Sequence, residues 1–310
     1  MESEALDTVP PPRVSAPATP PPAGACDVHA HAFGPYERFP LRHRPSYPPP
    51  LSPAATHRAM LDTVGLARGV LVQPAPYGED TSALCDALSA GAGRLRGVAV
   101  ASPGASDATL EALAGAGVTG LRFVDKLDPS GAPYAGSVGT GALAQLGPRM
   151  ASLGWHAEVW GDLAKNLAVV ERFGEVGPAI VLDHLGGVSA ARDDGLERER
   201  LLALVREGRV WVKLTLCRAS QDRPGYGDLR RFHDALVEAN PGRLLWGSDF
   251  PFVRMGADAP DVGRLMDLFM TWVDDPGLQR RILCDNPATL YGFPSLAAPR
   301  DGGSHDHQPG

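Results

Sequence analysis

Short runs of apolar and β-branched residues recur along the chain, each bounded by Gly, Pro or a charged residue, and this pattern is typical of buried β-strands. We expect eight strands, within residues 25–31, 69–75, 96–103, 118–124, 155–160, 179–186, 210–216 and 244–251. Segments with helical spacing of apolar residues lie between and after them, at 110–117, 163–173, 196–208, 229–240 and 262–273. Strand and helix therefore alternate, which favours a parallel sheet with helical crossovers.

Eight strand–helix units in a chain of 310 residues predict a single α/β domain, a (β/α)8 TIM barrel, which we place at residues 25–294. No Gly-rich phosphate-binding motif follows the first strand, which argues against an open nucleotide-binding sheet. Residues 1–24 are rich in Pro and Ala without apolar periodicity, and residues 295–310 are polar and Gly-rich. We expect both of these ends to be disordered tails.

The residues that close each strand matter most for function, because TIM barrels carry their chemistry at the C-terminal ends of the strands. The first strand ends in His29 and His31, and a spacing of two puts both side chains on one face. The sixth strand ends in His184 and the eighth in Asp249. Taken singly, each is more simply read as a structural histidine or a turn-capping aspartate. Their joint occurrence predicts one site at one rim.

The other histidines are expected to be structural or solvated. His156 lies near the start of the fifth strand and so on the far side of the barrel. The rest lie in predicted loops, helices or tails: His43, His57, His233, His305 and His307.

Basic and aromatic residues near the same rim indicate an anionic substrate. Arg122 closes the fourth strand, Arg218 follows the seventh, and Arg44 and Tyr47 lie in the loop after the first. A planar guanidinium matches a carboxylate through two parallel hydrogen bonds. For Arg44 a solvated surface charge is an equally good reading.

Lys213 lies inside an apolar run of a chain that has only three lysines. Alternation places it with Trp211 and Thr215, on one of the two faces of its strand. A buried lysine in a barrel could form a Schiff base with a carbonyl substrate, which would make the protein a lyase. An ion pair with a rim carboxylate or a substrate contact are the alternatives.

Charge and cysteine content narrow the function classes further. The net charge is −7 and no cluster of Lys and Arg is long enough to follow a phosphate backbone, so nucleic acid is not an expected partner. No apolar stretch is long enough to cross a membrane, and the start of the chain lacks the features of a signal peptide. Four scattered cysteines favour reduced thiols and a cytoplasmic location. The oligomeric state is left open.

Eight segments, in this order between about Cys26 and Phe293, resemble the amidohydrolase superfamily (amidohydrolase-related family 2), in the lactonase branch typified by 2-pyrone-4,6-dicarboxylate lactonase. They are DVHAHAFGP, FPLRHRPSYPPP, LVQPAPYGED, GLRFV, LDHLGG, VWVKLTLCRAS, LLWGSDFPF and DNPATLYGF. The resemblance implies a TIM barrel that opens lactone rings, with Arg and Tyr side chains holding substrate carboxylates. The positions matching the family's site are His29, His31, His184 and Asp249, with Tyr47 and Tyr77 at its substrate contacts.

The chemistry of ester hydrolysis explains these residue types. A carboxylate can take a proton from attacking water, which makes Asp249 the expected general base. Imidazole donors can stabilise the oxyanion that forms on the carbonyl oxygen, a role for His29, His31 and His184. We therefore expect a hydrolase that opens a small carboxylated lactone.

Two departures from the family pattern concern the substrate. The basic cluster after the fourth strand is reduced to Lys126, and Tyr77 is followed by GEDT rather than Gly-Thr-Asp-Asn. The substrate need not be the pyrone dicarboxylate.

The resemblance also raises the question of a metal, because the four catalytic candidates are of the types that bind zinc in the wider superfamily. A ligand usually comes from the end of the fifth strand, where this chain offers Glu158, Trp160 and Gly161, and His156 is too early to reach. We expect no metal cofactor. One alternative is a metal-dependent hydrolase or decarboxylase that binds a divalent ion such as zinc at His29, His31, His184 and Asp249. Glu158 or water would then complete a weak site. The other alternative is a barrel that binds a ligand without catalysis.

Overall fold

Eight parallel strands form one sheet in the order β1 to β8 in the computed structural model, which describes residues 7–175 and 177–294. The strands are β1 Cys26–Ala30, β2 Arg68–Val72, β3 Leu95–Ala99, β4 Val118–Val124, β5 His156–Trp160, β6 Ile180–Leu182, β7 Trp211–Lys213 and β8 Leu244–Leu245. Ala30 pairs with Phe250, beyond β8, and the Val28 N–H donates to the Trp246 carbonyl at 3.1 Å, so β8 and its continuation return to β1. The predicted (β/α)8 barrel is confirmed.

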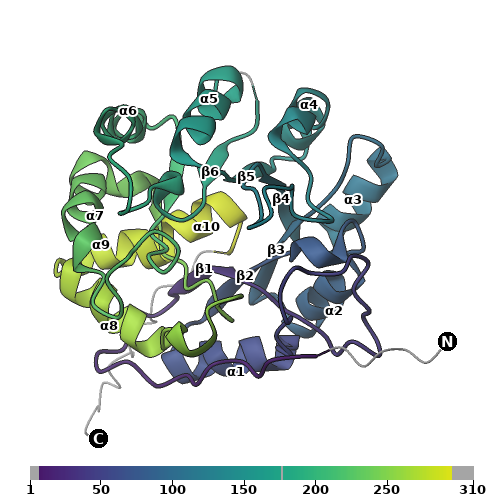
Figure 1. Ribbon diagram of the computed structural model, residues 1–310, viewed down its shortest axis with the longest axis horizontal. Helices are drawn as coiled ribbons and strands as arrows, with labels where there is room; N and C mark the ends of the chain where they lie inside the picture. Colours follow the sequence, from purple (N-terminus) through teal and green to yellow (C-terminus); the bar gives the residue numbers. More distant parts are fainter. Residues whose placement is uncertain (1–6, 176, 295–310) are drawn as a thin grey trace, which may run out of the picture.

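Helices surround the strands as a ring (Figure 1). They are α1 Ala54–Val64, α2 Ser82–Ala90, α3 Asp107–Gly115, α4 Leu143–Ser152, α5 Leu163–Phe173, α6 Gly195–Arg206, α7 Gly227–Ala239, α8 Val262–Trp272, α9 Pro276–Arg280 and α10 Asn286–Tyr291. Short 3-10 turns are η1 Ala75–Tyr77, η2 Thr140–Ala142, η3 Leu185–Gly187, η4 Pro241–Arg243 and η5 Gly256–Asp258, and a π-helical turn is η6 Arg281–Asp285. Within the described ranges, no helix has the length and apolar character that a membrane crossing requires.

The local sequence explains where individual helices begin and which face they bury. Asp261 precedes α8 and its carboxylate accepts the Gly263 N–H at 2.8 Å, a side-chain cap of the helix start. In α5 the buried Leu163, Leu167 and Val170 follow the helical spacing and face the barrel. Buried apolar residues at helical spacing are thus what the sequence used to predict these helices, and a side-chain cap is added at only some of them, such as α3 and α8.

Alternating strand residues supply two apolar layers. One set packs against Tyr291 of the C-terminal helix α10 and includes Val70, Val72, Val98, Val181 and Leu245. The other set packs under the ring of helices and includes Leu71, Leu121, Phe123, Ala157 and Val159. Helix α10 crosses the middle of the ring in Figure 1. The Tyr291 ring lies edge-on to His156, the first residue of β5, with centroids 5.0 Å apart. The N-terminal end of the barrel is therefore covered, and His156 lies there as expected.

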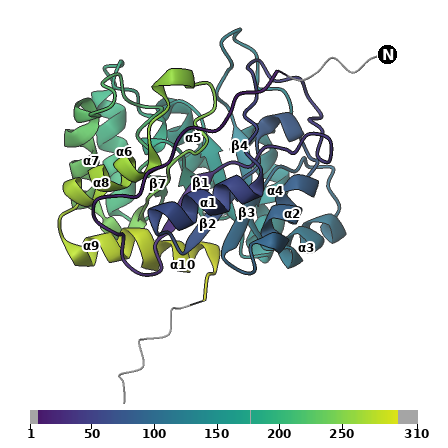
Figure 2. The ribbon, with the colours of Figure 1, turned by 90° about the horizontal axis from the view of Figure 1, so that it is seen from below.

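The N-terminal segment differs from the disordered tail that the sequence predicted. Residues 7–24 run along the outside of the barrel past α1 and α8 (Figures 1 and 2). The Ser15 N–H donates to Asp261 at 3.0 Å, and the Ala18 N–H donates to Asp267 at 2.7 Å. An extended Pro-rich chain has free backbone N–H groups, and here carboxylates of α8 accept them. The predicted tail at 295–310 lies outside the described residues, as do residues 1–6.

Candidate active site

Four side chains that the sequence assigns to catalysis meet at the C-terminal end of the barrel. His29 lies in β1 with His31 just beyond it, His184 follows β6, and Asp249 follows β8. The Asp249 Oδ1 atom is 3.7 Å from His29 Nε2 and 3.5 Å from His31 Nε2. The rings of His29 and His184 are 5.0 Å apart between centroids. The predicted set is therefore one constellation in space.

Contacts behind β1 hold its two histidines in position. The Asp27 carboxylate accepts the backbone N–H groups of His29 at 3.1 Å and Ser248 at 2.9 Å, and the Ser248 hydroxyl at 2.5 Å. These bonds tie β1 to the residues that follow β8. The His31 Nδ1 atom lies 2.7 Å from the Val72 carbonyl oxygen, so Nδ1 carries a proton and donates it. The Nε2 atom of His31 is then left facing the site.

His184 and Asp249 both have left-handed backbone conformations, with φ of 50° and 72°. This conformation costs a non-glycine residue roughly 1 kcal/mol, and such residues concentrate at functional sites. Both residues lie where the chain leaves the barrel wall and turns over the strand ends. Their side chains line the same cavity as a result.

The Asp249 carboxylate is buried and held from one side. Arg218 Nε donates to its Oδ2 at 2.6 Å, and the Cys217 thiol is 3.3 Å from the same oxygen. Burial alone would raise the pKa of Asp249, but the Arg218 guanidinium and the contact with His31 outweigh it and hold that pKa well below its ordinary value. The carboxylate is ionised at neutral pH, and Oδ1 faces the imidazoles.

The two innermost imidazoles are neutral at physiological pH. Burial, to which the Lys213 ammonium adds, holds the pKa of His29 well below 6.5. Burial also lowers the pKa of His184 to about 3, despite the nearby Asp249 carboxylate. Each ring therefore offers one N–H donor and one acceptor nitrogen.

A cavity of about 480 Å³ opens above this constellation. Its walls come from strand ends and loops around the rim, and five cationic side chains of the described chain line it: Arg122, Lys126, Arg218, Arg223 and Arg254. The acidic lining residues are Asp128, Asp249 and Asp258. A protein of net charge −7 thus concentrates positive charge at one cavity, which suits an anionic ligand.

The substrate-binding candidates divide into those that reach the cavity and those that do not. Arg122, Arg218, Tyr47 and Lys126 line it. Arg122 stacks over the Trp160 ring, with its guanidinium carbon 5.3 Å from the ring centroid, and Lys126 pairs with Asp162 at the rim.

Tyr77 and Lys213 are not among the described residues that line the cavity. The Tyr77 hydroxyl accepts the Gly34 N–H at 2.7 Å, and its ring packs with Phe33 and Phe39. A substrate contact by Tyr77 stays a prediction, and in this structure its hydroxyl is bonded inside the protein. Arg44 is exposed and also lies outside the lining.

Several lining residues were missed by the sequence reasoning. Arg223 and Arg254 lie on the loops after β7 and β8, and Tyr134 and Trp160 stack on each other with centroids 5.3 Å apart. The Arg254 guanidinium bonds the Tyr134 hydroxyl. Arginines on long loops carry no periodic signal that would separate them from solvated charges.

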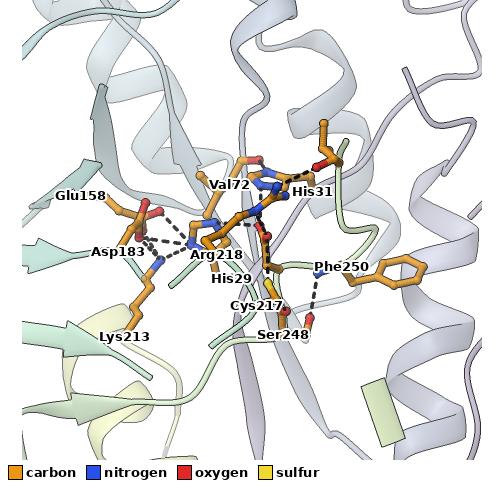
Figure 3. A network of polar contacts seen from close by, with 12 residues as sticks. His29, His31, Val72, Glu158, Asp183, Lys213, Cys217, Arg218, Ser248 and Phe250 are labelled. Carbon is orange, nitrogen blue, oxygen red and sulfur yellow. Dashed lines mark hydrogen bonds and ion pairs between the residues drawn. The ribbon is translucent and has the colours of Figure 1, made fainter. Parts of the chain in front are cut away.

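A buried ionic cluster lies beneath the cavity. The Lys213 Nζ atom is 2.5 Å from Glu158 Oε2, 3.4 Å from Asp183 Oδ1 and 3.0 Å from His29 Nδ1 (Figure 3). The face of β7 that carries Trp211 and Lys213 therefore looks into the barrel. An amine bound by three groups and away from the cavity lining does not fit a Schiff-base nucleophile, so the lyase alternative has no support in this geometry.

The described residues contain two groups with metal-ligand spacing. One comprises His29, His184 and Asp249, and the other comprises His29, Glu158 and Asp183. In the second group the Lys213 ammonium already lies against all three members. In the first, the buried His29 Nε2 makes no hydrogen bond within the described chain, so a divalent ion fits these donors. Such an ion would polarise a carbonyl or acidify a bound water.

The chain matches known proteins over most of its length. The family model described as amidohydrolase matches residues 26–293. The 2-pyrone-4,6-dicarboxylate hydrolase of Comamonas testosteroni is 33% identical over 283 residues, covering 87% of this chain and 90% of that protein. A 4-sulfomuconolactone hydrolase of Rhizobium radiobacter is 34% identical over 286 residues, covering 87% and 91%.

A solved structure agrees with these matches. The crystal structure of a putative 2-pyrone-4,6-dicarboxylic acid hydrolase from Pseudomonas putida is 31% identical, covers 88% of this chain and 99% of its own, and superposes with a TM-score of 0.74. Agreement of the family model, two sequence relatives and a structure over the whole barrel shows that the chain belongs to the amidohydrolase family.

Proposed function

We propose that the chain is a hydrolase that opens the ring of a small carboxylated lactone, with water as the second substrate. The observation that carries this proposal is the position of Asp249, an ionised carboxylate beside three imidazoles at the base of a cation-lined cavity. Two relatives above 30% identity are named as hydrolases of 2-pyrone-4,6-dicarboxylate and of 4-sulfomuconolactone. The cationic lining supports an acidic ring substrate for this chain as well.

Substrate binding falls to the cations at the cavity wall. Arg122 is only 5% exposed and its Nε makes no hydrogen bond within the described chain, so it has unused donors for a carboxylate. Arg218 also lines the cavity, but its Nε already donates a hydrogen bond to Asp249. A carboxylate that pairs with Arg218 would weaken its hold on Asp249, and the basicity of Asp249 would rise when substrate is present. Substrate binding would thus make Asp249 a stronger base.

Asp249 then takes the proton as water attacks the lactone carbonyl. A bond forms between the water oxygen and the carbonyl carbon, and negative charge develops on the carbonyl oxygen. The imidazole N–H groups of the site, which include the unpartnered Nε2 of His29, are the donors for that charge. The ring C–O bond breaks as the tetrahedral centre collapses, and the proton held by Asp249 passes to the ring oxygen. The product is an open-chain hydroxy or keto acid.

Replacement of Asp249 by Asn tests this role. We expect the variant to fold and to bind substrate, and to lose at least three orders of magnitude in kcat, because the amide cannot accept the proton. Steady-state kinetics and a binding titration on the same preparation separate the two effects. Turnover near the wild-type rate would remove Asp249 from the reaction.

We also propose that turnover needs no metal, with the metal-dependent hydrolase or decarboxylase as the competing hypothesis. The Arg218 guanidinium already pairs with Asp249, and the Lys213 contact with His29 Nδ1 favours a proton rather than a lone pair on Nε2, the atom that an ion beside His184 and Asp249 would use. We expect full activity after exhaustive chelation and less than one equivalent of metal by elemental analysis. One stoichiometric zinc, with activity lost on its removal and restored on its return, would establish the competing hypothesis instead.

A further inference from the structure

The cluster beneath the cavity contains more charge than any other buried part of the described chain. Glu158 from β5, Asp183 after β6, Lys213 from β7 and His29 from β1 all have no exposed surface. Figure 3 shows the Lys213 side chain reaching up toward the two carboxylates and the His29 ring. Arg122 adds a second cation, with Nη2 3.8 Å from Asp183 Oδ2. Two carboxylates thus face two cations in a place that water does not reach.

Three groups compete for the Nδ1 atom of His29. The Lys213 Nζ is 3.0 Å away, Asp183 Oδ1 is 3.2 Å away and Glu158 Oε1 is 3.4 Å away. Only the lysine contact has the geometry of a hydrogen bond, because these two carboxylate oxygens have no hydrogen-bond partner in the described chain. An ammonium can only donate. The His29 Nδ1 must then be the acceptor, which leaves the ring proton on Nε2.

The position of that proton decides what His29 can do at its other nitrogen. The Nε2 atom points at Asp249, with Oδ1 at 3.7 Å, and belongs to the group that includes His184. If Nε2 carries the ring proton, Nε2 is a hydrogen-bond donor. If the proton lies instead on Nδ1 and is donated to Asp183, Nε2 presents a lone pair. This second state is the usual one for a metal-bound histidine backed by a carboxylate.

We propose that Lys213 is a positioning residue whose ammonium occupies a cation site formed by His29, Glu158 and Asp183, and holds His29 as a donor rather than a metal ligand. Lys213 itself touches neither cavity nor substrate. Its effect on catalysis rests on the proposed hydrolase function, because a donor at His29 Nε2 serves the oxyanion. The effect of Lys213 on the position of the His29 proton and on metal affinity is independent of that proposed function.

The test replaces Lys213 by Met, which keeps length and volume but removes the charge. In wild-type protein labelled with 15N-histidine, we expect the His29 resonances of the Nε2–H tautomer. In Lys213→Met we expect the proton to move to Nδ1, where Asp183 can accept it. Nε2 is then free to bind, so zinc affinity measured by titration against a competing chelator should rise at least tenfold. Adding His184→Asn should abolish that gain.

Two controls separate positioning from folding. Lys165→Met removes a lysine that is exposed and bonds only the Asp125 carbonyl, and should change neither the His29 tautomer nor zinc affinity. Lys213→Met with Glu158→Gln restores the charge balance and provides a folded variant if the single one unfolds. The proposal is overturned if wild-type His29 carries its proton on Nδ1, or if neither folded Lys213 variant changes the tautomer and zinc affinity. No substrate is used, so these results stand apart from the hydrolase proposal.

Discussion

Individual arginines at this rim differ in what they touch, and that difference makes them separable by mutation. Arg122 lines the cavity and Arg44 is exposed outside it, although both were candidates when only the sequence was considered. Sequence position alone identified Arg122 because it closes an apolar strand. It could not place Tyr77, whose side chain turns into a small apolar cluster rather than toward the cavity. The direction of a loop side chain depends on tertiary packing that no local pattern encodes.

Arg122→Ala is predicted to raise KM for carboxylated lactones by ten- to a hundredfold. Charge-assisted hydrogen bonds contribute about 1.5 to 3 kcal/mol, and the alanine removes both donors of the pair. Initial rates over a substrate range for Arg122→Ala and for Arg44→Ala supply the comparison, with Arg44→Ala expected at the wild-type KM. If an uncharged lactone suffered the same loss, the arginine would not be acting on a carboxylate.

Among helices and other segments, those with a periodic apolar pattern were predicted from the sequence, whereas those held by tertiary contacts were not. The helices with a clear apolar stripe, such as α5 and α8, were predicted within a few residues. The segment at 7–24 was not, because extended chain held by carboxylates of α8 has no periodicity. Helix α10 covers the end of the barrel through Tyr291, a role that follows from barrel closure and not from its six residues.

Helix α1 carries an acid-sensitive residue on its buried face. Neither ring nitrogen of His57 has a hydrogen-bond partner in the described chain, and burial, with Arg58 and Arg94 adding to it, lowers the pKa of His57 from 6.5 to about 3. Between these values the unfolded chain binds a proton that the folded chain does not. The stability from this residue is therefore present above pH 6.5 and is lost as the pH falls toward 3.

His57→Leu should make the fold less sensitive to acid. Linkage predicts that His57 lowers the free energy of unfolding by about 2 kcal/mol between pH 7 and pH 5. Over the same interval, the free energy of unfolding of the variant should fall by that much less than that of the wild type. Urea unfolding at the two pH values measures it, with His43→Leu, on an exposed loop, as the matched control. An unchanged pH dependence in His57→Leu would show that His57 is not the group that titrates.

At the scale of the whole molecule, the barrel was predictable because eight strand–helix repeats leave few other topologies. The sequence also predicted which strand ends meet, since all parallel strands present their C-terminal residues at one end. It offered an ion pair of Lys213 with a rim carboxylate as one alternative, but it did not identify Glu158 and Asp183 as the partners. Three charges on three strands become neighbours only once the barrel closes. The cavity likewise collects its five cations from three regions of the chain, at the end of β4, after β7 and after β8, and the net charge of −7 gives no sign of this local excess.

Ring opening can be followed directly, because hydrolysis of a lactone at neutral pH releases one acid equivalent. We would measure acid release at fixed pH from a panel of lactones that carry no, one or two carboxylates, using wild-type protein and Asp249→Asn side by side. The proposed function predicts turnover of at least one carboxylated lactone, little or none of the uncharged ones, and loss of that turnover in Asp249→Asn. Acid release at equal rates by both proteins, or no release from any lactone of the panel, would contradict it.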